Sequence, residues 1–166
     1  MKHAALLMLI AMAAFGHCRA QSYTPIAYAI DTSATPHADG CLPLDSANSP
    51  FFQLRGKYPE SSRRLAARAA AFLKEHGVLL SGSGYIRYGL QIDCTGLLLQ
   101  IYRISQTDSS YRQAWFAKEP VEALALFIRT LNRWNDGTSK YYPRPVNYFT
   151  FLEFHIINGV ITDVIP

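Results

Sequence analysis

The chain ends in Phe149-Thr-Phe-Leu-Glu-Phe-His-Ile-Ile-Asn-Gly-Val-Ile-Thr-Asp-Val-Ile-Pro166, where two runs of β-branched and aromatic residues flank Asn158-Gly159. Such runs are typical of β-strands, and an Asn-Gly dipeptide adopts the positive φ angles that a two-residue hairpin turn needs. The sequence therefore predicts a β-hairpin, with a first strand over residues 147–157 and a second strand over residues 160–165.

A second pair of strands is predicted upstream of this hairpin. In residues 85–93 every second side chain is apolar and points to one face, as in a half-buried strand. These side chains are Ile86, Tyr88, Leu90 and Ile92. Cys94-Thr95-Gly96 is expected to form a tight turn, and residues 97–104 are expected to return as the partner strand.

Apolar side chains at helical spacing predict two helices. The first opens at Tyr58-Pro59 and runs to about His76, with Gly77 as its C-terminal cap. The second starts at Glu119-Pro120, because proline is favoured in the first helical turn, and ends at Trp134. The predicted fold class is α+β: an antiparallel sheet with the order strand, strand, helix, strand, strand, packed by one or two helices.

The first twenty residues have the three parts of a secretory signal. A basic start at Lys2 precedes an apolar run over residues 4–15, and the small residue Ala20 comes before the mature chain. The run is shorter than the about 20 apolar residues of a transmembrane helix. We therefore expect cleavage and a mature protein that is periplasmic or secreted, with no membrane span. Lipidation at Cys18 is the alternative, but His17 stands where a small residue is expected.

Composition indicates the domain organisation and excludes one class of partner. Cleavage removes Lys2 and Arg19 and no acidic residue, which lowers the formal net charge from +4 to +2. Without a basic stripe or a recognition motif, nucleic acid is not an expected partner. Residues 21–57 mix Thr, Ser, Ala and Pro without any period and are expected to be irregular, whereas residues 58–166 form the α+β domain.

Cys41 and Cys94 are the cysteines that remain after cleavage. In an exported protein an even number of cysteines suggests a disulfide, and here only one pairing exists. Two unrelated thiols are the alternative. Export favours the bridge, because a free thiol is a liability in an oxidising compartment.

Few residues suggest catalysis or metal binding. Cys94 and His155 form a conceivable nucleophile and base pair on neighbouring strands, but a histidine on the outer face of a sheet is commoner than a catalytic one. Asp93 and Asp136 stand where turns are expected. The remaining histidines are separated by whole structural elements and lack metal-ligand spacing; they are His37, His76 and His155. The sequence therefore predicts no enzyme, no metal site and no cofactor.

Aromatic residues are the more informative candidates for binding. Tyr141 and Tyr142 lie in a loop between Lys140 and Pro143 and are expected on the surface, as in sites for extended or proline-rich peptides. Most other aromatic residues are expected to fill the core beneath the helices. This group includes Trp134, Phe149 and Phe151.

Several stretches of the chain resemble the C-terminal domain of TonB and its relatives, above all the stand-alone or receptor-linked versions of Bacteroidetes. The matching stretches are Tyr58-Pro59, Leu90-Gln-Ile-Asp-Cys-Thr-Gly96, Leu124 to Trp134, and Phe149 to Gly159 with the closing Ile-Thr-Asp-Val-Ile-Pro. The likeness covers residues 58–166.

The resemblance implies a periplasmic interaction module whose last strand is an edge that pairs with a segment of an outer-membrane transporter. Carried over to this chain, it implies a site on the C-terminal hairpin. Tyr148, Thr150 and Leu152 share one face of its first strand, and the loop residues Tyr141 and Tyr142 precede it. The expected partner is another envelope protein, with such a transporter segment as an example.

The added strand over residues 160–165 is the main departure from the family pattern, because it lies next to the edge that the family uses. The alternative function is a small secreted ligand-binding domain or enzyme of cystatin-like or nuclear-transport-factor-like layout. A deep apolar pocket with convergent polar groups between helix and sheet would favour that alternative. A filled core and an exposed sheet edge would favour the interaction module.

Overall fold

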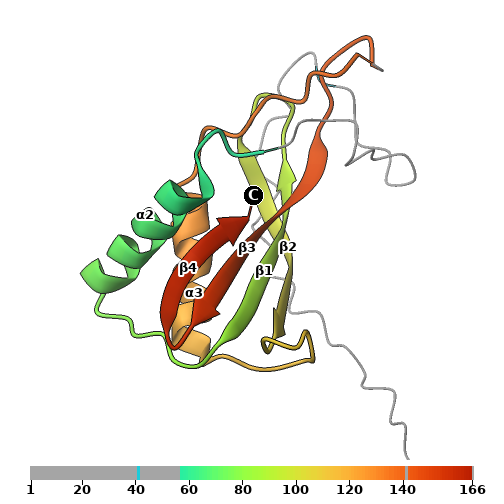
Figure 1. The fold of residues 1–166 in the computed structure, drawn as a ribbon. Coiled ribbons are helices and arrows are strands. Elements are labelled where there is room, and N and C mark those ends of the chain that lie inside the picture. Colours follow the sequence, from blue (N-terminus) through green and yellow to red (C-terminus); the bar gives the residue numbers. More distant parts are fainter. Residues whose placement is uncertain (1–40, 42–56, 141, 166) are drawn as a thin grey trace, which may run out of the picture.

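The computed structural model of the protein describes residues 41, 57–140 and 142–165. The predicted signal over residues 1–20 lies outside this part, as does the predicted irregular segment 21–57 except for Cys41 and Lys57. The described elements are, in chain order, α2 (Ser62–Glu75), β1 (Gly84–Ile92), β2 (Leu98–Thr107), α3 (Lys118–Arg129), β3 (Tyr148–Ile157) and β4 (Val160–Ile165) (Figure 1).

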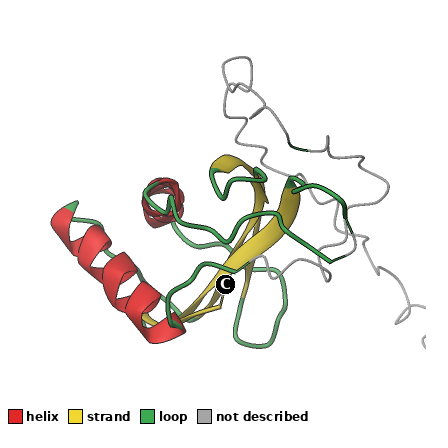
Figure 2. Cartoon of the chain, turned by 90° about the horizontal axis from the view of Figure 1, so that it is seen from above, coloured by secondary structure: helices red, strands yellow, loops and turns green. Residues whose placement is uncertain are grey.

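The four strands form one antiparallel sheet in the order β2-β1-β3-β4. Both helices lie on the same side of this sheet (Figure 2). α2 packs along β4 and also contacts α3. The predicted fold class, α+β with helices packed on an antiparallel sheet, is confirmed.

Alternation along the strands decides which side chains enter the core. The apolar side chains predicted to share one face of β1 are all fully buried; they are Ile86, Tyr88, Leu90 and Ile92. α2 contributes Leu65 and Ala69 to the same core, and α3 contributes Leu124 and Ile128. Burying a large apolar side chain stabilises a fold by about 1.5–3 kcal/mol, so this layer between helices and sheet is the main source of stability.

The terminal hairpin forms as predicted. Asn158 and Gly159 have φ angles of 49° and 77°, the left-handed values of the expected two-residue turn. β4 starts at Val160 and runs antiparallel to β3, and the ladder between them covers residues 153–157 of β3. In the described sheet β4 is therefore one edge strand and β2 is the other.

α2 begins later than the sequence predicts. Its first residue is Ser62, because Ser61 is extended and its hydroxyl accepts a hydrogen bond from the N–H of Arg64 (3.4 Å). Tyr58 lies before the helix and is buried. Gly77 follows the helix with a φ of +67°, which confirms it as the C-terminal cap.

α3 ends at Arg129, so the prediction that this helix reaches Trp134 is wrong. The N–H groups of Thr130 and Leu131 bond to carbonyls three residues back, and this tighter turn closes the helix. Trp134 lies in the segment that follows. It is nevertheless buried, as predicted for a core residue.

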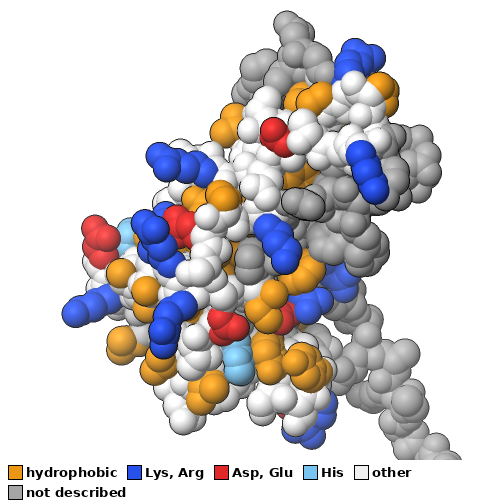
Figure 3. All heavy atoms as spheres, turned by 45° about the horizontal axis from the view of Figure 1, so that its top comes forward, with side chains coloured by type: hydrophobic (Ala, Val, Ile, Leu, Met, Phe, Trp, Pro, Cys, Tyr) orange, Lys and Arg blue, Asp and Glu red, His pale blue; other side chains and the backbone are white. Residues whose placement is uncertain are grey.

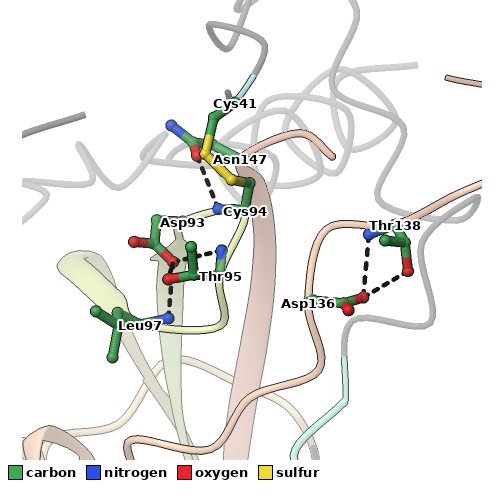
Figure 4. Close-up of a disulfide and its surroundings, with 8 residues drawn as sticks. All are labelled: Cys41, Asp93, Cys94, Thr95, Leu97, Asp136, Thr138 and Asn147. Carbon is green, nitrogen blue, oxygen red and sulfur yellow. Dashed lines mark hydrogen bonds between the residues drawn. A yellow bond between two sulfur atoms is a disulfide. The ribbon is translucent and has the colours of Figure 1, made fainter. Parts of the chain in front are cut away.

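The disulfide between Cys41 and Cys94 is confirmed, with a Cα–Cα distance of 5.8 Å (Figure 4). It attaches the N-terminal segment to the turn after β1, where the N–H of Cys94 donates to the side-chain oxygen of Asn147 (2.9 Å). The Asp93 carboxylate accepts two backbone hydrogen bonds within this turn, and Asp136 accepts one after α3. The predicted turn roles of Asp93 and Asp136 are thereby confirmed.

Candidate functional site

A surface groove lies between the C-terminal half of α2 and the start of β4. Its volume is about 430 Å3. The lining is mostly apolar and includes Leu73, Lys74, Val78, Leu79, Val160 and Ile161. Concave, largely apolar surfaces of this kind are the usual places for a ligand or a partner.

The loop after α2 builds one wall of the groove. Because Gly77 ends the helix, the N–H of Val78 turns back to the carbonyl of Leu73 (2.9 Å). This bond draws Val78 into the core, whereas the next side chain, Leu79, is 86% exposed. The wall therefore presents a large apolar side chain to solvent.

The hairpin turn builds the opposite wall and is held to the same loop. The N–H of Gly159 donates to the carbonyl of Gly82 (2.7 Å). Glycine is needed here, because a Cβ at residue 159 would lie 2.5 Å from the carbonyl oxygen of Leu80. Val160 follows and is 59% exposed. Two exposed apolar side chains, Leu79 and Val160, thus line the groove. Backbone contacts hold its two walls together.

α2 closes one part of the β4 edge and leaves another part beside the groove. The Ser62 hydroxyl accepts a hydrogen bond from the N–H of Val164 (3.0 Å) and donates to the Asp163 carboxylate. The backbone of Val164 therefore points away from β3. Val160 faces β3, since it closes the two-residue hairpin. The backbone of the next residue, Ile161, consequently points to the outer edge beside the groove.

Lys74 is the one charged side chain among the described residues that line the groove. Two arginines nearer the start of the same helix, Arg64 and Arg68, instead pair with Glu60. Figure 3 shows hydrophobic side chains together with basic and acidic ones on the side of the molecule where α2 ends and β4 begins. The groove thus combines an apolar surface with a single positive charge.

The helix-free face of the sheet carries aromatic and charged side chains that contact one another. Tyr85 stacks between Tyr111, at 4.7 Å between ring centroids, and His155, at 4.6 Å. A hydrogen bond with Tyr111 raises the pKa of Tyr85. Arg87 pairs with Glu153 (2.7 Å) on the same face. Because these groups pair with each other, this face is a weaker candidate for a binding site than the groove.

The side chains predicted to bind a partner are not gathered on a surface. Tyr148, Thr150 and Leu152 pair with β1 and are at most 3% exposed, because their side chains point into the core. Tyr142 is half-buried against the core, and Tyr141 lies outside the described residues. The side chains of Tyr148, Thr150 and Leu152 therefore belong to the core, and a partner role at these positions stays a prediction.

Phe149 and Phe151 lie on the helix-free face and are half-buried, so the prediction that they fill the core is wrong. Phe149 packs edge-on against Tyr102, with 5.0 Å between ring centroids. The guanidinium of Arg87 lies 4.8 Å from the ring centre of Phe151, a cation–π contact. Both rings are therefore held by neighbours on their own face of the sheet.

Cys94 and His155 are not brought together. Cys94 is bonded to Cys41 at the turn after β1, whereas His155 lies opposite Tyr85 near the start of β1. Within residues 57–140 and 142–165, together with Cys41, His, Cys, Asp and Glu side chains form no group of three or more that could hold a metal ion. The groove is therefore the candidate site of the described part of the chain.

No protein-family model, no curated protein and no solved structure matches this chain. Among the described helices, none combines the length and the apolar character that crossing a membrane requires. A functional proposal accordingly rests on the groove, on the β4 edge and on the sequence.

Proposed function

We propose that the protein is an exported, TonB-like interaction module that captures an extended segment of another envelope protein, such as an outer-membrane transporter. The observation that carries the proposal is the apolar groove beside the outward-facing backbone of Ile161 on the edge strand β4. A partner strand would take main-chain hydrogen bonds from β4 and place alternate side chains in the groove.

The topology and the disulfide support this proposal. The order β1, β2, α3, β3 is the one that the TonB-like resemblance implies. The Cys41–Cys94 disulfide is typical of proteins that fold in an oxidising compartment such as the periplasm. β4 pairs with residues 153–157 of β3, so over this part of the sheet the edge that would bind a partner belongs to β4.

A ligand-binding domain of cystatin-like or nuclear-transport-factor-like layout would need a deep pocket with convergent polar groups. The space between helices and sheet is instead occupied by large buried side chains, which include Tyr88, Phe127 and Phe154. The groove lies at the surface, and Lys74 is the one charged side chain among its described lining residues. These features favour an interaction module.

The variant Leu79→Asp tests the proposal. It places a charge on the wall of the groove, and we expect capture of the partner from envelope extract to fall at least about tenfold, as for a buried apolar contact at an interface. Leu126→Asp is the matched control, because Leu126 is 50% exposed on α3 and does not line the groove. This control should capture the partner as the wild type does.

Both variants are first compared with the wild type by thermal unfolding, since surface substitutions change stability by about 0.5 kcal/mol or less. Mass spectrometry then identifies the captured protein, and limited proteolysis of the complex identifies the protected segment. Equal capture by Leu79→Asp and the wild type would overturn the proposal, as would an equal loss in both variants.

A further inference from the structure

We infer that the groove takes a short, extended and mainly aliphatic segment of the partner, with one carboxylate that faces Lys74. This inference rests on the proposed function and specifies the chemistry of the partner. Two features of the site lead to it: the accessible stretch of the β4 edge is short, and the lining carries a single charge.

The accessible stretch of the β4 edge is bounded at both ends. Ser62 occupies the backbone N–H of Val164, so a partner strand cannot pair there. At the other end, the bond from Gly159 to Gly82 holds the hairpin turn against the loop. Residues 160–163 lie between these contacts and span about 13 Å at the usual rise of a strand. A partner segment of about four residues therefore fits along β4, and it would take its backbone hydrogen bonds from Ile161.

Side chains must supply most of the affinity for so short a segment, because each backbone hydrogen bond contributes little net free energy. The groove offers apolar contacts from Leu73, Val78 and Ile161, with Leu79 and Val160 at the surface. Alternate side chains of a bound strand point to the same face. We therefore expect aliphatic side chains at every second position of the partner segment.

Lys74 gives the groove its electrostatic preference. The ion pairs found between described residues do not involve Lys74. A carboxylate on the bound segment would pair with this ammonium group, and a cation at the same position would be repelled. The chemistry that the site recognises is thus an aliphatic strand with one acidic residue.

Three acetylated and amidated hexapeptides test this inference. They consist of alternating valine and threonine and differ at one terminal position, which holds glutamate, glutamine or lysine. Dissociation constants are measured by NMR titration of the purified protein. We expect the glutamate peptide to bind about threefold more tightly than the glutamine peptide and about tenfold more tightly than the lysine peptide.

The variant Lys74→Glu should reverse this order, so that the lysine peptide binds most tightly. Lys57→Glu is the matched control, because Lys57 is exposed, precedes α2 and does not line the groove. This control should keep the wild-type order of the three peptides, which separates a local contact at Lys74 from a general effect of net charge.

The outcomes distinguish this inference from the proposed function. If Lys74→Glu keeps the wild-type order while Leu79→Asp still lowers capture of the envelope protein at least about tenfold, the prediction of an acidic residue in the segment is wrong and the proposed function stands. If no peptide binds the wild type at about 1 mM, the predicted chemistry of the segment is wrong, and the proposed function still stands as long as Leu79→Asp lowers capture. If Leu79→Asp changes neither peptide binding nor capture, the proposed function itself is wrong.

Discussion

Trp134→Ala is expected to lower the free energy of unfolding by about 3–5 kcal/mol, the range for a buried tryptophan truncated to alanine. The Trp134 side chain is 4% exposed and packs edge-on against Tyr58, with 5.2 Å between ring centroids. Its Nε1–H donates to the carbonyl of Leu131 (3.0 Å). Its backbone N–H donates to the carbonyl of Gly96 (3.3 Å) and so links this segment to the turn after β1. Alanine would leave a cavity at this junction.

Urea unfolding of the purified, oxidised protein measures the effect of Trp134→Ala. Trp115→Ala is the matched control, because Trp115 is 69% exposed and its loss should change stability by about 0.5 kcal/mol or less. A cost below about 1 kcal/mol for Trp134→Ala would contradict the burial of this side chain.

Loss of the Cys41–Cys94 disulfide is expected to lower the free energy of unfolding by about 4 kcal/mol. The two cysteines are 53 residues apart in the sequence, and closing a loop of that size restricts the unfolded chain by about this amount. The double variant Cys41→Ser/Cys94→Ser should therefore unfold at a lower urea concentration than the oxidised wild type.

Reduction of the wild type provides the control for this experiment. The reduced wild type should unfold at the midpoint of the double variant, and the reductant should leave the midpoint of the double variant unchanged. If the oxidised wild type and the double variant differ by less than about 1 kcal/mol, the bridge does not stabilise the domain as expected.

The strands could be predicted because their signals are local. Asn158-Gly159 marks a turn through its own backbone preference, and the alternation over residues 85–92 reports burial directly. The end of α3 could not be predicted in the same way. Trp134 continues the apolar spacing of the helix, but it packs from the segment beyond Arg129. Apolar residues at helical spacing indicate which side chains are buried. A buried residue that follows the end of a helix can fall on the same spacing, so the spacing does not locate the end of the helix.

The buried face of β3 could have been predicted correctly. Glu153 and His155 are polar and alternate with Leu152, so they identify the helix-free face of the strand. The same alternation places Thr150 in the core, where the structure has it. The resemblance drew attention to the edge of β3 at Thr150 and Leu152, whereas the added strand β4 pairs only with residues 153–157 of β3.

The groove could not be predicted, because its walls come from residues 70–80 and 159–161, which are far apart in the sequence. One local signal was available: Val78-Leu79-Leu80 is an apolar run that follows Gly77 and therefore lies outside the helix. The opposite wall depends on the packing of α2 along β4, which Ser62 helps to hold. Contacts of this kind appear only in the folded chain.

The amide of Ile161 provides the most direct test of capture at β4. Its N–H points to the outer edge of the sheet and would donate a hydrogen bond to a backbone carbonyl of a partner strand. Hydrogen exchange is measured on the protein alone and in complex with the captured envelope protein. The proposed function predicts that exchange at Ile161 slows at least about tenfold in the complex. Unchanged exchange at Ile161, with protection instead on the helix-free face around Tyr85, would contradict strand addition at β4.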